Sequence, residues 1–233
     1  MPKSSEVRPE VVANCMGIDV PASPFLHEKR IERINAARYE GQEIEGALHV
    51  VREGDSILEL GAGIGIVGAV VSKIRKPKIV QSYEANPSLI PHINALYQAN
   101  GLTKTNRVFN EVLVSAPDSP ATMPFYVHNS FLGSSLFGSN ETAKETVDVP
   151  TAGYDDVRRD LKPDVILMDI EGGELAFLEH ANLDGVRAIV AEFHPKAYEV
   201  AGMRRCKSIL RDAGFEPLAD FSTRTVWVAT REL

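Results

Sequence analysis

The stretch that most constrains the fold runs from residue 56 to residue 68, with the sequence SILELGAGIGIVG. It begins with a short apolar run interrupted by Glu59 and ends in a second apolar run. Between the two runs stand three alternating glycines, Gly61, Gly63 and Gly65. This pattern predicts a buried strand, a tight turn and the start of a helix. Glycine has no Cβ, so such a turn lets the backbone and the free N–H groups of the helix approach a ligand closely.

Two classes of nucleotide cofactor fit this turn, and a joint between strand and helix without any ligand is a third interpretation. Gly63, Gly65 and Gly68 spell the G-x-G-x-x-G of dinucleotide sites, a weak signal by itself. Glu59, Gly61, Gly63 and Gly65 spell the pattern of methyltransferases, with an acid before the loop. A carboxylate there repels a pyrophosphate, whereas it attracts the ammonium group of S-adenosylmethionine. We therefore predict S-adenosylmethionine as the cofactor, with an NAD-dependent oxidoreductase as the alternative.

Composition limits the class of protein and its partners. The 233 residues suffice for one α/β domain with a full core. The net charge of −7 argues against a nucleic-acid partner held through phosphate contacts. Cys15 and Cys206 are far apart and form no CxxC motif, which is typical of a reducing compartment. No apolar run approaches the ~18 residues of a membrane span, and no apolar signal core is evident, so we expect a cytoplasmic protein without a membrane partner.

The order of apolar segments predicts the architecture. Residues 1–24 carry four prolines and little periodicity, and are predicted to be an N-terminal extension before a methyltransferase domain at 25–233. Predicted helices cover 25–39, 43–51, 66–74, 87–100, 154–161, 174–181 and 203–213. Predicted strands cover 56–60, 78–83, 107–114, 123–127, 147–150, 164–168, 188–191, 215–219 and 225–229. The alternation predicts a Rossmann-like class I methyltransferase fold: a mostly parallel seven-stranded sheet with one antiparallel C-terminal strand and helices on both faces.

The loop at 129–144 is rich in Ser, Gly and Asn but carries embedded apolar residues. Long polar loops of this kind serve as binding loops, or lie on the surface held down by their own apolar side chains. Phe131 and Phe137 from this loop, together with Phe193, are candidates for an apolar wall around the acceptor, although each of them fits a core position equally well.

Two polar residues at predicted strand ends are candidates for binding the nucleoside. Glu84 stands 19 residues after Gly65, at the end of the second strand of the sheet. Both cofactor classes place an acid there to accept hydrogen bonds from ribose, and a carboxylate can accept from both hydroxyls of a cis-diol. The alternative is a solvated acid at a strand end. Asn110, near the end of the next strand, is expected near the adenine.

The second informative stretch is 167–174, LMDIEGGE, where three carboxylates follow a buried strand. Ligands bind at the carboxyl ends of strands in an open α/β sheet, so Asp169 and Glu171 are expected to face the methionine end of the cofactor and the acceptor. Glu174 falls in the first turn of the next helix, where the helix dipole alone favours an acid.

These residues carry a resemblance to a known family. Asp169-Ile-Glu-Gly-Gly-Glu174, with Val149-Pro-Thr before it and Glu192-Phe-His-Pro195 after it, resembles the FkbM family of S-adenosylmethionine-dependent methyltransferases. The resemblance covers roughly residues 54–229. It implies a class I methyltransferase fold and the methylation of a hydroxyl on a small molecule, a natural product or a sugar. Family members commonly carry Asn where this chain has Gly63, which instead agrees with the general methyltransferase loop.

A neutral hydroxyl is a poor nucleophile, so a base or a metal is expected to help remove its proton. His194 is the first candidate base because a free imidazole titrates near pH ~6.5, and Asp169 is the second. A histidine that only bonds a nearby carbonyl is the alternative. Candidate ligands for a divalent metal are Asp169, Glu171, Glu192 and His194, which would suit Mg²⁺ or Ca²⁺. Their spacing does not require an ion, so we predict a site without metal; a methyltransferase-like binding protein without catalysis also remains open.

Overall fold

The computed structural model describes residues 10–127 and 145–232. Its central element is a seven-stranded sheet in the order β11-β12-β10-β9-β3-β4-β5. The strands are β3 (Ser56–Leu60), β4 (Ile79–Tyr83), β5 (Asn106–Phe109), β9 (Val165–Met168), β10 (Ala188–Glu192), β11 (Glu216–Pro217) and β12 (Val226–Thr230). Five of them, from β10 to β5, run parallel, whereas β12 is antiparallel to both of its neighbours. The predicted α/β class with a mostly parallel sheet is confirmed.

Helices cover both faces of this sheet, as its sequence pattern requires. One face packs against α2 (Gly41–Val50), α3 (Ile66–Arg75) and α4 (Ile90–Ala99), and the other against α5 (Tyr154–Leu161), α6 (Glu174–Leu178) and α7 (Pro195–Asp212). Successive residues of a strand point to opposite faces, so Ile57 joins the first core and Leu58 the second. Strands buried on both faces need apolar residues at nearly every position, which is why the apolar runs predicted them.

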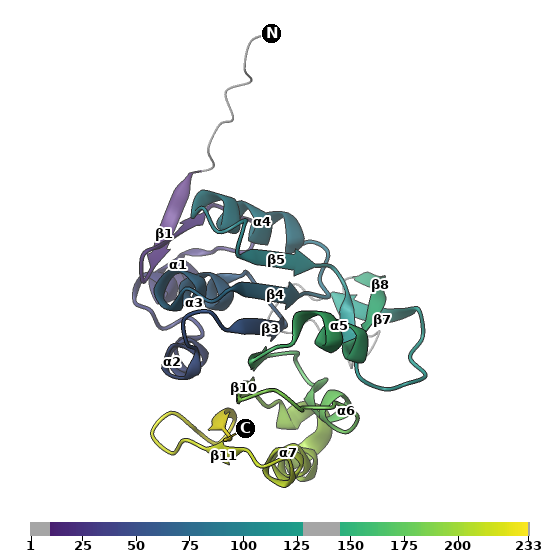
Figure 1. Ribbon diagram of the computed structural model, residues 1–233. Helices are drawn as coiled ribbons and strands as arrows, with labels where there is room; N and C mark the ends of the chain where they lie inside the picture. Colours follow the sequence, from purple (N-terminus) through teal and green to yellow (C-terminus); the bar gives the residue numbers. More distant parts are fainter. Residues whose placement is uncertain (1–9, 128–144, 233) are drawn as a thin grey trace.

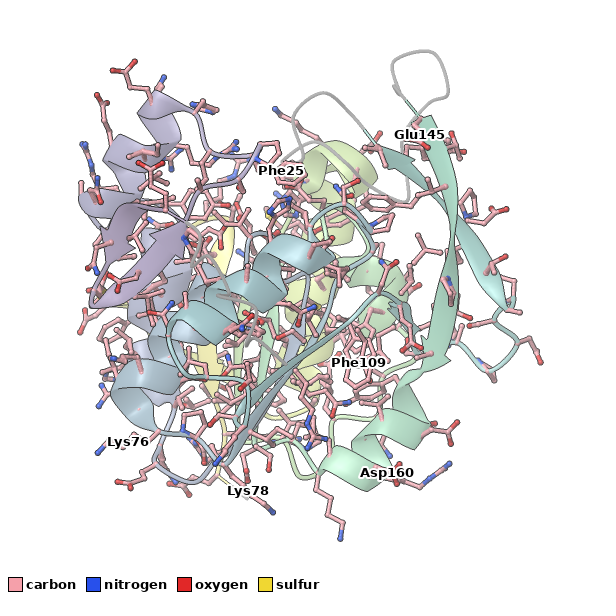
Figure 2. All side chains as sticks on the ribbon, turned by 90° about the horizontal axis from the view of Figure 1, so that it is seen from above. Phe25, Lys76, Lys78, Phe109, Glu145 and Asp160 are labelled. Atoms are coloured by element: carbon pink, nitrogen blue, oxygen red, sulfur yellow. The ribbon has the colours of Figure 1, made fainter. Side chains whose placement is uncertain are left out.

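The strand order places a crevice at the carboxyl ends of β3 and β9. From β3 the chain continues through α3 to β4 and through α4 to β5, whereas β9 pairs with β3 on its other side. In Figure 1 the arrowheads of β3, β4 and β5 all point toward the side where β7 and β8 lie. Figure 2 shows Lys78, which precedes β4, and Asp160, which precedes β9, at one edge of the molecule, with Glu145 of β8 at the opposite edge. Such a switch in strand order is where open α/β sheets bind ligands.

A small second sheet borders this crevice. It consists of β6 (Val112–Val114), β8 (Glu145–Gly153) and β7 (Thr122–Val127), in that order. The predicted strand at 107–114 is therefore two strands in two different sheets. The break falls at Asn110, whose side-chain amide donates to the carbonyls of Glu84 and Ala85, so the chain leaves the large sheet there. The predicted binding loop at 129–144, with Phe131 and Phe137, lies outside the described residues.

The N-terminal part of the chain contains structure that the sequence pattern did not predict. Strands β1 (Val11–Cys15) and β2 (Ile18–Pro21) form a hairpin that was not predicted, whereas α1 (Glu28–Asn35), which follows it, lies within the helix predicted at 25–39. Asn100 at the end of α4 fixes the hairpin, since its side chain accepts from the N–H of Asp19 and donates to the carbonyl of the same residue. Cys15 and Ile18 are fully buried beneath it. The boundary between extension and domain at residue 24 stays a prediction.

The last helix is longer than predicted. α7 begins at Pro195 rather than near residue 203, because its first turn is joined to the rest across non-helical backbone at Tyr198 and Glu199. This kink interrupts the helical spacing of the apolar residues, so the sequence pattern predicted only the regular part of the helix that follows it. Across residues 10–127 and 145–232, no helix combines the length and apolar character needed to cross a bilayer.

Candidate functional site

A cavity of about 340 Å³ lies at the carboxyl ends of β3, β4 and β9, within the size range of small-molecule sites. Its lining comes from the loops after β3, β4, β5 and β9, from β6 and the loop after it, from β7 and α6, and from the residue that precedes α2. The polar side of the cavity includes Gly61, Gly63, Glu84, Asp169 and Glu171. The apolar side includes Leu113, Met123, Phe125 and Phe177. The cavity thus joins the two stretches that the sequence singled out.

The glycine loop forms one wall of the cavity, and Gly61 and Gly63 are required in it for different reasons. Gly61 has φ +81°, and a Cβ on it would lie 1.7 Å from the carbonyl oxygen of Asp169, so no side chain fits between β3 and β9. Gly63 has φ +55° and faces open space, since the atoms nearest to an added Cβ belong to Glu40 and Tyr39 at 3.8 and 4.0 Å. A ligand can therefore come directly against the backbone at Gly63.

Gly65 and Gly68 face the protein interior rather than the cavity. Gly65 precedes α3 with φ +82° and packs against Ile93 of α4. A Cβ on Gly68 would lie 2.7 Å from Oε2 of Glu59, whose carboxylate accepts hydrogen bonds from the N–H of Gly68 and the hydroxyl of Ser82. The carboxylate thus occupies the start of α3, where a dinucleotide site would hold its pyrophosphate.

Glu59 is almost completely buried, with 2% of its surface exposed. Burial raises its pKa to about 7, even though the hydrogen bonds from Ser82 and Gly68 act in the opposite direction. It borders a small cavity of about 20 Å³ behind the loop, not the large one. A direct contact between Glu59 and a ligand ammonium group stays a prediction.

Glu84 lies at the predicted place, directly after β4 in the wall of the large cavity. Its two carboxylate oxygens accept hydrogen bonds from the N–H groups of Gly63 and Asn86, each at 2.8 Å. Burial raises the pKa of Glu84 to about 7 despite these bonds. Asn110 holds the backbone at residues 84–85 in place, with N–O distances of 2.9 and 3.1 Å. A contact of Asn110 with adenine stays a prediction.

Beyond the end of β9, three carboxylates surround one histidine. Nδ1 of His194 lies 2.9 Å from Oε1 of Glu174, and Nε2 lies 3.4 Å from Oε2 of Glu171 and 3.6 Å from Oδ1 of Asp169. The position of the ring is also fixed by its backbone, since the N–H of His194 donates to the hydroxyl of Tyr198 at 2.7 Å. The predicted residues Asp169, Glu171 and His194 are thus brought together.

The electrostatics of this cluster differ from the expectation for a free imidazole. Burial alone would lower the pKa of His194, but the hydrogen bond to Glu174 and the charges of Asp169 and Glu171 outweigh it and raise that pKa to about 9. The pKa of His194 therefore lies above that of a free imidazole, about 6.5. Burial raises the pKa of Asp169, and the nearby charge of Glu40 adds to the effect. Burial also raises the pKa of Glu171 to about 7.

Glu174 has a larger role than the helix dipole suggested. It is fully buried, and its Oε2 has no hydrogen-bond partner within the described part of the chain. Ligand atoms of Asp169, Glu174 and His194 lie within 4.8 Å of one another, a donor set that a divalent cation accepts. This group differs from the four candidate ligands named above: it includes Glu174 and omits Glu171 and Glu192. The only sequence signal for Glu174 was its place in the 169–174 motif.

Of the three aromatic residues expected around the acceptor, only Phe193 lies within the described residues. Phe193 is buried in the second core, where its ring meets Trp227 at a centroid distance of 6.1 Å, so it forms no wall of the cavity. Glu40 and Tyr39, in contrast, lie against the glycine loop although no sequence pattern indicated either of them.

Comparison with known proteins agrees with this geometry. Residues 59–217 match the sequence model of the methyltransferase FkbM domain. Among solved structures, a precorrin-6y C5,15-methyltransferase from Geobacter metallireducens GS-15 is similar, with a TM-score of 0.50, 12% identity, and coverage of 95% of this chain and 98% of that chain. A protein from Listeria monocytogenes serotype 4b has a TM-score of 0.50 and 12% identity over 81% of this chain and 66% of that one. No curated protein matches the chain. At this identity the structures share the fold alone.

Proposed function

Because the chain belongs to the FkbM family of methyltransferases, we propose that it transfers a methyl group from S-adenosylmethionine to a hydroxyl of a small molecule. One observation carries the proposal: a single cavity joins the open backbone at Gly63, the buried carboxylate of Glu84 and the carboxylates of Asp169 and Glu171, which lie 3.6 and 3.4 Å from Nε2 of His194. The first two suit a nucleoside, and the third suits the removal of a proton. The acceptor class, the cytoplasmic location and the absence of nucleic-acid and membrane partners rest on the sequence alone.

The residues of the cavity fit an adenosyl group. Glu84 offers two carboxylate oxygens that backbone N–H groups hold in place, and a carboxylate can accept from both ribose hydroxyls. The apolar wall formed by residues such as Leu113 and Phe125 suits a base. The space in front of Gly63 admits a ligand where a side chain would block it.

The dinucleotide alternative fits less well. Its G-x-G-x-x-G pattern depends on Gly68, and the structure explains that glycine by the carboxylate of Glu59 packed against it. A pyrophosphate at the start of α3 would meet this carboxylate instead of free N–H groups. We therefore rank an NAD-dependent oxidoreductase second.

When bound, the cofactor supplies a methyl group activated by its sulfonium. The chain must then align the acceptor oxygen, exclude water and take the proton of the hydroxyl. We assign the proton to Nε2 of His194, while Glu174 holds Nδ1 and fixes the ring. With a pKa of about 9, most of the imidazole is protonated at pH 7, so the rate is expected to rise toward pH 9. Asp169, next to the same nitrogen, is the second acceptor for this proton.

A thermal-shift series tests the assignment of the cofactor. S-adenosylmethionine and S-adenosylhomocysteine should each raise the melting temperature, because a ligand that binds only the native state stabilises it. NAD should leave it unchanged. A shift with NAD and none with either adenosyl compound would reverse the ranking. Mg²⁺, Mn²⁺ and EDTA belong in the same series, since a shift with the ions would assign the Asp169–Glu174–His194 group to a metal.

A transfer assay separates an enzyme from a binding protein without catalysis. The purified chain is incubated with S-adenosylmethionine labelled in its methyl group and with a panel of sugars, phenols and aliphatic alcohols. We expect labelled product from at least one hydroxyl compound, and none when His194 is replaced by Ala. Binding of the cofactor without transfer to any member of the panel would favour the binding protein.

A further inference from the structure

A second acid reaches the glycine loop from the N-terminal side of the chain. Glu40 lines both the large cavity and the small one behind the loop. Its Oε1 lies 3.8 Å from the position that a Cβ on Gly63 would take. Glu40 precedes the first residue of α2, yet its side chain makes no capping hydrogen bond to that helix. The carboxylate is therefore directed to the cavity rather than used by its own helix.

The backbone that carries Glu40 adopts a conformation that side chains disfavour. Its φ of 47° and ψ of 38° lie in the left-handed region, which non-glycine residues adopt mainly where the surrounding structure imposes it. Ala37, three residues earlier, also has a positive φ of 51°. The connection between α1 and α2 thus contains two residues with unfavourable backbone angles. This conformation brings residues 39 and 40 next to Gly63.

Tyr39 gives an independent sign that a ligand group belongs here. Its side chain is 2% exposed, and among residues 10–127 and 145–232 its hydroxyl has no hydrogen bond of normal geometry, only a weaker interaction with the carboxylate of Glu40 that lowers the pKa of that acid. That hydroxyl lies 4.0 Å from the same Cβ position on Gly63. Buried hydroxyls are nearly always paired in native proteins, so this oxygen is in place for a partner that the chain itself does not provide.

The charge of this corner defines the missing partner. Glu43, Glu59 and Asp169 border the small cavity together with Glu40. Burial raises the pKa of Glu40 to about 8; the weaker interaction with the Tyr39 hydroxyl acts in the opposite direction, and the charges of Glu43 and Glu59 add to the rise. No Lys or Arg of the described chain forms an ion pair with Glu40. The corner combines several acceptors of hydrogen bonds with carboxyl groups that a cation carrying N–H donors would hold in their charged form.

We propose that Glu40 and Tyr39 form the subsite for a primary ammonium group, that of the methionine part of the cofactor; this inference rests on the function proposed above. Gly63 lies between the places proposed for the two ends of such a ligand. Its N–H donates to Glu84, which is assigned to the ribose, and Glu40 lies on its open side, where the ammonium group would be. Glu59 is less suited to the task because Ser82 and Gly68 already hold its carboxylate. Glu40 lies upstream of the matched segment 59–217, so the family match does not assign it.

Two ligands that differ in their amino-acid part distinguish binding at this subsite from binding in the rest of the cavity. S-adenosylhomocysteine carries the ammonium group, whereas 5′-methylthioadenosine keeps the nucleoside and thioether without it. We expect Glu40→Gln to weaken S-adenosylhomocysteine by about 10- to 100-fold in calorimetric titration, the range of a charge-assisted hydrogen bond, and to leave methylthioadenosine unchanged. Glu45→Gln, on the exposed side of the same helix, is the matched control and should change neither affinity.

The outcomes distinguish this inference from the function on which it rests. If wild type binds S-adenosylhomocysteine and Glu40→Gln binds it equally well, the ammonium subsite is refuted and the methyltransferase assignment stands. If wild type does not bind it at all, the proposed function itself fails. Should Glu40→Gln not fold, Tyr39→Phe carries the same test, because it removes only the hydroxyl. It should weaken S-adenosylhomocysteine about 3- to 10-fold, and an unchanged affinity would refute the subsite.

Discussion

Replacing Glu84 by Gln tests the nucleoside site with the smallest change of shape. The carboxylate accepts hydrogen bonds from the N–H groups of Gly63 and Asn86, those of Ala62 and Ala85 also stabilise its charged form, and we assign both of its oxygens to the ribose. The amide has one acceptor oxygen and must turn its NH₂ group toward either Gly63 or Asn86, where two donors would face each other. The variant thus loses the charge and one of the two acceptors.

The expected magnitude follows from those bonds. A hydrogen bond to a charged group contributes about 1.5–3 kcal/mol, against about 0.5–1.5 for a neutral pair. For two ribose hydroxyls the difference amounts to about 2–3 kcal/mol. Since about 1.4 kcal/mol is tenfold in Kd, the variant should bind S-adenosylhomocysteine about 30- to 150-fold more weakly than wild type at pH 8.

The same site predicts a dependence on pH. With a pKa of about 7, Glu84 in the free protein is protonated below pH 7 and charged above it, and the charged form is the better acceptor. Affinity should therefore rise from pH 6 to pH 8. In Glu84→Gln the rise should be smaller, since only other carboxyls of the site, such as Glu40 and Glu171, are left to contribute.

Isothermal titration calorimetry at several pH values measures both effects, with Glu45→Gln as a control for the loss of one charge on the surface. Equal affinity of wild type and Glu84→Gln at pH 8, with both proteins folded, would refute the assignment of Glu84 to the ribose. An affinity that falls as pH rises would refute the reasoning about its protonation.

Three further predictions concern the fold and the histidine cluster. Gly61→Ala should cost at least about 3 kcal/mol of unfolding free energy in urea, because its Cβ would overlap the carbonyl of Asp169; a loss below about 1 kcal/mol would contradict that packing. Glu174→Gln should lower the pKa of His194 by about one unit in an NMR titration, and an unchanged pKa would show that the buried acid does not act on the ring. Methyl transfer should accelerate between pH 7 and pH 9, whereas a flat profile would exclude His194 as the proton acceptor.

Much of the architecture was visible in the sequence because it depends on local pattern. Strands buried on both faces require apolar runs, and the turn after β3 requires Gly61, so both features are written directly in the residues. The hairpin of β1 and β2 was not visible, because short strands depend on contacts such as those of Asn100 that lie far away in the chain. The break between β5 and β6 has the same kind of cause, since the run at 107–114 is apolar on both sides of Asn110.

The candidate site shows a similar division. Glu84, Asp169 and Glu171 follow strands that the pattern identified, so their place beside the cavity could be predicted. Glu40 precedes a helix with an ordinary pattern, and only the fold of the connection before it brings the residue to Gly63. The pKa of His194 was beyond sequence reasoning as well, because it depends on how closely the three carboxylates of the segment 169–174 approach the ring in the fold.

A crystal structure of the complex with S-adenosylhomocysteine tests the central claim most directly. We predict the ligand in the cavity at the ends of β3, β4 and β9, with its ribose hydroxyls on Glu84 and its sulfur on the side of Asp169 and His194. A ligand bound elsewhere, or bound there without contact to Glu84, would contradict the account.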